Sequence, residues 1–125
     1  MAAPLTPAKQ KAWRFGQIAE TMAVWYLRVR GYQILARRFR CRAGEIDIIA
    51  RRGTLLVFIE VKARRNTATA AEALSTRQTS RIIRAAEAFV QAHPSLAGLD
   101  QRFDAILVQP RRWPVHLVDA WRPEH

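Results

Sequence analysis

Apolar residues near the start of the chain recur at helical spacing. Thr6 is a favourable N-cap, Pro7 suits the first helical position, and Gly31 suits the end of a helix. We therefore predict a helix that begins at Thr6 and ends near Gly31. Five residues at helical spacing form a stripe on one face of this helix: Gly16, Ala19, Glu20, Ala23 and Leu27. The small side chains of the stripe would let the helix lie close to a sheet. Glu20 is its one acid.

Two runs rich in β-branched residues follow within residues 43–65 and predict a pair of short strands. Gly53 separates the two runs, and Gly53-Thr54 suits a two-residue hairpin loop with glycine in its first central position. The β-branched residues of the two runs are Ile46, Ile48, Ile49, Val57, Ile59 and Val61.

The hairpin loop sets the register of these two strands. With the Gly53-Thr54 loop, Arg52 faces Leu55, and counting back along both strands brings Asp47 opposite Glu60. If the loop instead began one residue earlier, Glu45 would face Glu60 and Asp47 would lie diagonally to it. Both registers place the acids on the same face.

The remaining patterns predict an α/β domain over residues 1–125 with three layers, a mixed central sheet of about five strands flanked by helices. A polar stretch of small residues at 66–70 is the best candidate for a mobile loop. The other predicted elements are a strand at 32–42, a helix at 75–92 ended by Pro94, and strands at 101–109 and 115–121.

Charge changes this picture most. The chain has 21 basic and 10 acidic residues, and residues 28–84 alone hold 14 basic and four acidic ones, which supply ten of the eleven net positive charges. This excess predicts a polyanionic partner, although a basic surface can also serve solubility alone. The residues that we expect to bind nucleic acid are Arg37, Arg38, Arg40, Arg42, Arg64, Arg65, Arg77 and Arg81.

Composition also bears on the compartment. Cys41 is the one cysteine, which excludes an internal disulfide and fits a reducing cytoplasm. No apolar run approaches the roughly 20 residues of a membrane span, and the N-terminus lacks the pattern of a signal peptide. We expect a cytoplasmic protein without a membrane partner.

The opposed acids of the hairpin carry the candidate chemistry. Like charges directly opposite one another destabilise a sheet, and a divalent cation such as Mg²⁺ or Mn²⁺ would relieve the repulsion between Asp47 and Glu60. Alternation places Lys62 on the face of Glu60. The alternative is an exposed strand face decorated with charges, which Leu56 and Phe58 on the same face make less favourable.

Asp47 followed by Glu60-Val61-Lys62 resembles the PD-(D/E)XK arrangement of the restriction-endonuclease-like nucleases. The wording GEIDIIA followed by FIEVKAR resembles more narrowly the YraN-like bacterial family of predicted endonucleases, which is similar to archaeal Holliday-junction resolvases. This resemblance extends from Gly16 to about Val108 and implies a restriction-endonuclease-like core.

The resemblance also implies a function, hydrolysis of phosphodiester bonds in DNA, including branched or junction DNA. One or two Mg²⁺ or Mn²⁺ ions would be held by Glu20, Asp47 and Glu60, and Lys62 would orient a water or stabilise the transition state. Without the resemblance, the pattern favours a satisfied or partly exposed glutamate at position 20. Symmetric cutting of two strands would require two sites and hence a homodimer. The alternative is a catalytically silent nucleic-acid-binding module of the same fold. Arg102-Phe103-Asp104 resembles a family motif, and the resemblance implies a structural role for Asp104, with a metal-ligand role as the alternative.

Overall fold

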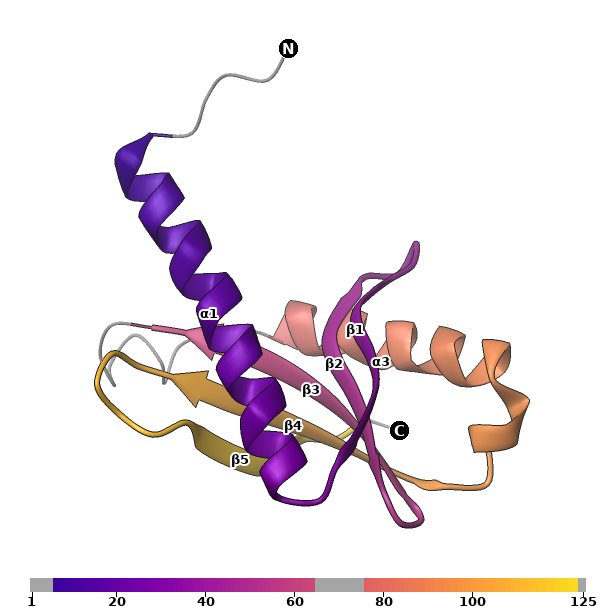
Figure 1. Cartoon of the computed structure of the whole chain (residues 1–125). Helices are drawn as coiled ribbons and strands as arrows, with labels where there is room; N and C mark the ends of the chain where they lie inside the picture. The colour runs from indigo at the N-terminus through magenta and orange to yellow at the C-terminus, as the bar shows by residue number, and fades with distance from the viewer. Residues whose placement is uncertain (1–5, 65–75, 124–125) are drawn as a thin grey trace.

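The structure is a computed structural model that describes residues 6–64 and 76–123 (Figure 1). The predicted loop at 66–70 lies outside the described residues. The elements, in chain order, are α1 (Pro7–Val29), β1 (Gln33–Arg40), β2 (Glu45–Arg52), β3 (Leu55–Ala63), α3 (Thr76–Ala92), a short 3₁₀ helix (Pro94–Leu96), β4 (Asp100–Val108) and β5 (Val115–Trp121).

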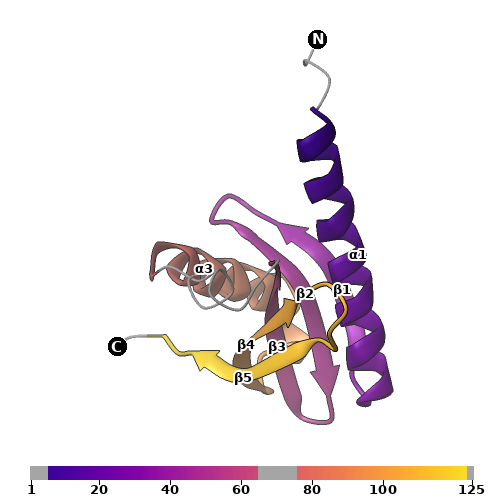
Figure 2. The ribbon, with the colours of Figure 1, turned by 90° about the vertical axis from the view of Figure 1, so that its left-hand side faces the viewer.

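The five strands form one mixed sheet in the order β1-β2-β3-β4-β5. β3 and β4 run parallel, while the other neighbouring pairs run antiparallel. A parallel pair needs a crossover connection, and α3 lies in the segment that makes it. α1 covers one face of the sheet and α3 the other (Figures 1 and 2). The predicted three-layer α/β fold is confirmed.

Helix α1 forms as the sequence pattern predicts. The Thr6 hydroxyl accepts a hydrogen bond from the Lys9 backbone N–H at 3.2 Å, and Gly31 adopts a positive φ of 87° just after the helix. Ala19, Ala23 and Leu27 are fully buried against the sheet, whereas Gly16 is exposed. The buried part of the stripe therefore starts one turn later than predicted.

The other face of the sheet packs against α3 through aromatic side chains. Phe58 stacks on Phe103 with ring centroids 5.4 Å apart, and Phe89 of α3 meets Phe58 edge-on. The face of α3 that packs on the sheet is apolar, with Val90 partly buried and the rest buried: Ile82, Ala85, Ala86 and Phe89.

The β2–β3 hairpin has the first of the two predicted registers. Gly53 adopts a φ of 62° in the loop, and regular pairing runs from Arg52↔Leu55 to Ile48↔Ile59. The two-residue loop fixes which residues of the two strands lie opposite each other, because loop length and turn type set the register of a hairpin. The next position along the hairpin brings the two candidate acids together.

Candidate active site

Glu60 lies near the end of β3 and is only 7% exposed. Its Oε1 accepts a hydrogen bond from Gln78 Nε2 of α3 at 2.7 Å and pairs with Lys62 Nζ at 3.0 Å. The predicted placement of Lys62 beside Glu60 is thus observed. Two donors from different elements hold this carboxylate in a fixed orientation.

Asp47 lies next to Glu60 on β2. Its Oδ2 accepts a hydrogen bond from the backbone N–H of Val61 at 2.8 Å. Burial, the charge of Glu60 and a hydrogen bond to Glu60 together raise the pKa of Asp47 to about 8, against the lowering effect of the Val61 N–H. The pair therefore holds a proton at neutral pH, as two carboxyl groups in close contact do.

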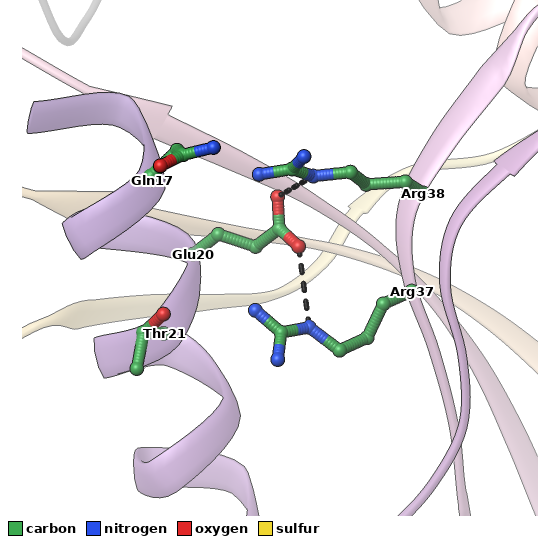
Figure 3. Close-up of a pocket in the computed structure, with 5 residues that line it drawn as sticks. All are labelled: Gln17, Glu20, Thr21, Arg37 and Arg38. Atoms are coloured by element: carbon green, nitrogen blue, oxygen red, sulfur yellow. Dashed lines mark hydrogen bonds and ion pairs between the residues drawn. The ribbon is translucent and has the colours of Figure 1, made fainter. Parts of the chain in front are cut away.

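Glu20 reaches the same end of the sheet from α1 and is also 7% exposed. Figure 3 shows its two carboxylate oxygens held by two arginines of β1: Arg37 Nε lies 3.3 Å from Oε1 and Arg38 Nε lies 3.0 Å from Oε2. The three residues line an open pocket of about 380 Å³ together with Gln17 and Thr21 of α1. Every side chain of this α1–β1 pocket is polar or charged.

Two consecutive strand residues normally point to opposite faces of a sheet. Arg37 and Arg38 instead contact the same carboxylate, because Arg38 has a φ of 53° and breaks the alternation of β1. The packing on either side shows the break: Ile48, the partner of Arg37, packs toward α1, and the next pair, Phe39 and Ile46, packs toward α3.

This break in β1 lies beside the acids. The flanking pairs Arg37↔Ile48 and Phe39↔Ile46 place Arg38 across from Asp47. Glu20 raises the pKa of Arg38 by a hydrogen bond and by its charge, and Asp47 adds to the rise. Because Glu20 also raises the pKa of Asp47, the three carboxylates share one electrostatic environment.

The structure brings Asp47 and Glu60 together but leaves Glu20 with its arginines. Among the residues that the structure describes, no three acidic, histidine or cysteine side chains converge as a ready-made metal site. The donor set nevertheless fits a hard divalent cation, since carboxylate oxygens are what Mg²⁺ and Mn²⁺ prefer. A cation would also replace the proton that the Asp47–Glu60 pair retains.

The other predicted nucleic-acid contacts are spread over the surface. Arg40 is exposed, and its Nε lies 3.5 Å from a carboxylate oxygen of Glu45. Arg42 and Arg81 are also exposed. The Arg64 side chain donates a hydrogen bond to the backbone carbonyl of Ala63. Arg65 and the side chain of Arg77 lie outside the described part of the chain.

Sequence reasoning missed Gln78, the α3 residue that holds Glu60. Gln78 follows Arg77, one of the residues expected to bind nucleic acid, in the first turn of α3. A polar residue at the start of a helix gives no pattern that indicates a contact with a strand. Only the packing of α3 on the sheet shows the contact.

Another buried acid, Asp104, lies in a separate structural network. Its side chain is fully buried and pairs with Arg102 Nη2 at 2.8 Å and His116 Nε2 at 2.6 Å, and it accepts from the Asp119 N–H at 2.9 Å. Burial alone would raise the pKa of Asp104, but these hydrogen bonds outweigh burial and lower it. The contacts agree with the structural role that the resemblance implies.

Among the described residues, no helix combines the length and the apolar character that a membrane crossing requires.

The mixed five-stranded sheet with a helix on each face is consistent with a restriction-endonuclease-like core. The Asp47–Glu60–Lys62 cluster lies on β2 and β3, two inner strands of this sheet. The chain belongs to the family described as "Uncharacterised protein family UPF0102", whose model matches residues 19–108. This match confirms the YraN-like resemblance.

Several relatives carry the same family name and align over most of their length. The chain is 54% identical to a UPF0102 protein of Parvibaculum lavamentivorans over 112 residues, 90% of this chain and 84% of the relative. It is 53% identical to one of Nitrobacter winogradskyi over 110 residues, 88% and 93% of the two chains. A third, from Rhodopseudomonas palustris, is 50% identical over 118 residues, 94% and 91%.

Proposed function

We propose that this protein is a metal-dependent nuclease that hydrolyses phosphodiester bonds in DNA, with branched or junction DNA as the first substrates to test. The observation that carries the proposal is the Asp47–Glu60 pair, a half-buried and a buried carboxyl group in contact beside a lysine in a strongly basic chain. Acids within a basic surface weaken phosphate binding unless a cation turns them into an attractive site.

Asp47 and Glu60 are the residues that would hold Mg²⁺ or Mn²⁺, with Glu20 as a third ligand once its arginines release it. When bound, one or two such ions supply an activated water and neutralise negative charge on the phosphate. Gln78 orients Glu60 through its 2.7 Å hydrogen bond, so the carboxylate needs little rearrangement to bind.

Lys62 supplies a fixed positive charge. Its side chain is 12% exposed and its Nζ is anchored 3.0 Å from Glu60. An ammonium group that is already in place stabilises negative charge that develops on the phosphate, because the group does not have to move during the reaction. Lys62 would therefore contribute to the transition state or orient the attacking water.

The proposal includes a setting and partners. Nucleic acid, DNA in the first place, would bind along the exposed arginines, and a homodimer would supply the two sites that symmetric cutting requires. The single cysteine supports a reducing cytoplasm as the compartment.

A catalytically silent nucleic-acid-binding module is the second candidate. The observation in its favour is that the Glu20 carboxylate is engaged by Arg37 and Arg38 in place of joining the other two acids. In such a module the acids would tune binding alone.

The test is a cleavage assay on a panel of linear, flap and four-way-junction DNA, with matched RNA strands, in Mg²⁺ and in Mn²⁺. Glu60→Gln keeps the side-chain volume and removes the charge, and Glu87→Gln makes the same change at an exposed position of α3. We expect cleavage and metal-dependent thermal stabilisation in the wild type and in Glu87→Gln, and neither in Glu60→Gln.

Undiminished cleavage by Glu60→Gln would remove Glu60 from the site. A wild type that binds metal and nucleic acid but cuts nothing in the panel would favour the silent module.

A further inference from the structure

The α1–β1 pocket holds two guanidinium groups against one carboxylate. The Arg37 and Arg38 side chains are each 44% exposed, whereas that of Glu20 is 9% exposed, so the arginines keep open sides toward the pocket. Gln17 and Thr21 add an amide and a hydroxyl from the adjoining turns of α1 (Figure 3). The pocket thus has one net positive charge and several hydrogen-bond donors.

A phosphodiester group matches this set of donors. It carries one negative charge, as the Glu20 carboxylate does, and its non-bridging oxygens accept hydrogen bonds from arginine. The Glu20 carboxylate occupies both Nε donors in the free protein. A phosphate that takes these donors must therefore displace Glu20.

The left-handed backbone at Arg38 supports a role for the pocket. A positive φ is unfavourable for a residue with a long side chain, and regular alternation would direct Arg38 to the opposite face from Arg37. Such strained positions concentrate at sites of function. Here the strain has an identifiable result, the second arginine on Glu20.

We infer that the α1–β1 pocket is a phosphate-binding site whose occupant in the free protein is the Glu20 carboxylate, and that phosphate binding releases Glu20 toward the Asp47–Glu60 pair. The inference rests on the proposed function, which supplies the cation, Mg²⁺ or Mn²⁺, at the Asp47–Glu60 pair. Phosphate binding adds a third carboxylate to the pair, and a cation that attracts Glu20 frees the arginines. By linkage, phosphate and cation each raise the affinity for the other by the same factor.

The experiment uses the dinucleotide TpT, which carries one phosphodiester, and inorganic phosphate as a second probe for a terminal phosphate. Isothermal titration measures the affinity for each probe with and without Mg²⁺. In the wild type we expect Mg²⁺ to tighten TpT binding at least about fivefold, the lower end of usual coupling between sites. Tighter binding of inorganic phosphate than of TpT would assign the pocket to a strand end.

Two variants separate the partners. Glu20→Gln removes the competing carboxylate, so TpT should bind at least about fivefold tighter without metal, and Mg²⁺ should add little. The Arg37→Gln/Arg38→Gln double variant should not bind TpT and should bind Mg²⁺ tighter than the wild type when no phosphate is present. The matched control is Glu87→Gln, the same change at an exposed position of α3 on the other face of the sheet, which should behave as the wild type.

Independent binding of Mg²⁺ and TpT, unchanged TpT affinity in Glu20→Gln, or no TpT binding by any folded variant would each overturn the inference. If Glu20→Gln does not fold, as judged by circular dichroism, the arginine double variant decides the outcome alone through its Mg²⁺ affinity. Cleavage is not a readout here. If the protein cleaves DNA but binds Mg²⁺ and TpT independently, the inference is wrong and the proposed function stands. If Mg²⁺ and TpT binding are coupled but no DNA is cleaved, the inference stands and the proposed function is wrong.

Discussion

Asp47 shows how a single residue is set by opposing contacts. Burial and Glu60 favour its protonated form, whereas the Val61 N–H favours the carboxylate, and the balance raises its pKa to about 8. The folded protein therefore binds a proton at this pair that the unfolded chain would not retain at neutral pH. Metal binding at this pair should release that proton.

The pH dependence of stability follows from this pKa. Between about pH 4 and about pH 8 the folded protein holds a proton on Asp47 that the unfolded chain lacks, so stability should fall as the pH rises through this range. Asp47→Asn keeps the shape and cannot ionise, so its stability should vary less with pH and exceed that of the wild type at pH 8. Urea unfolding at pH 5 to 8 without metal tests this.

Asp100→Asn, at an exposed position at the start of β4, is the control for the charge change. Parallel stability curves for the wild type and Asp47→Asn would show that Asp47 does not carry the proton.

Strand β1 is the element that links both halves of the site. Its irregular backbone at Arg38 directs two arginines to α1, and the turn that follows it, closed by backbone hydrogen bonds between Cys41 and Gly44, lies against α3. The hairpin formed by β1 and β2 therefore contacts both helices. Changes in β1 should affect the site from a distance.

Arg38→Gly and Arg38→Ala remove the same ion pair but differ in backbone freedom. Glycine accepts the φ of 53° without a steric penalty, so Arg38→Gly should be more stable than Arg38→Ala by about 1 kcal/mol. Denaturant unfolding of both variants measures the difference. Alanine that proves equal or better would show that β1 relaxes to regular alternation once the arginine is gone.

Gly44 tests the contact between the β1–β2 turn and α3. A Cβ at this position would lie 3.2 Å from Arg81 Cβ and 3.3 Å from the Arg81 carbonyl oxygen, closer than ordinary packing. Gly44→Ala should lower the free energy of unfolding by about 1 kcal/mol, since helix backbone cannot easily move. Gly98→Ala, with nothing within 4 Å of its added Cβ, is the control. Equal stability of the two variants would contradict the contact.

The whole molecule carries a net charge of +11, which favours a nucleic-acid partner through release of counterions. The α1–β1 pocket places two of the positive charges beside the acids. Other arginines are free of the site carboxylates and extend the basic surface along the β1–β2 hairpin. Arg40 and Arg42 are the exposed members there.

Arg40→Ala/Arg42→Ala should weaken DNA binding to a similar extent for all sequences and lower the slope of log K against log salt by about one for each phosphate that the variant no longer neutralises. Fluorescence anisotropy between about 50 and about 200 mM salt, a range over which phosphate-binding proteins show large changes in affinity, measures the slope. Arg28→Ala, more than two helical turns beyond Glu20 on α1, is the control. An unchanged slope in the double variant would exclude this hairpin from the footprint.

The sequence by itself determined the helices, the strands and the register of the β2–β3 hairpin. These depend on local chemistry: a Thr6 cap, the Gly53 loop and the alternation of apolar residues act over a few neighbours. The same local count brought Asp47 beside Glu60 and Lys62 onto the face of Glu60.

Only the tertiary structure decided which side chains pair with each carboxylate. Gln78 reaches Glu60 because α3 crosses the sheet, and Glu20 meets Arg37 and Arg38 because α1 packs beside a strand whose backbone departs from alternation. No period in the sequence encodes such contacts, since each joins residues 17 or 18 positions apart through the packing of a helix on the sheet. Local patterns thus position the acids, and long-range packing determines their charge partners.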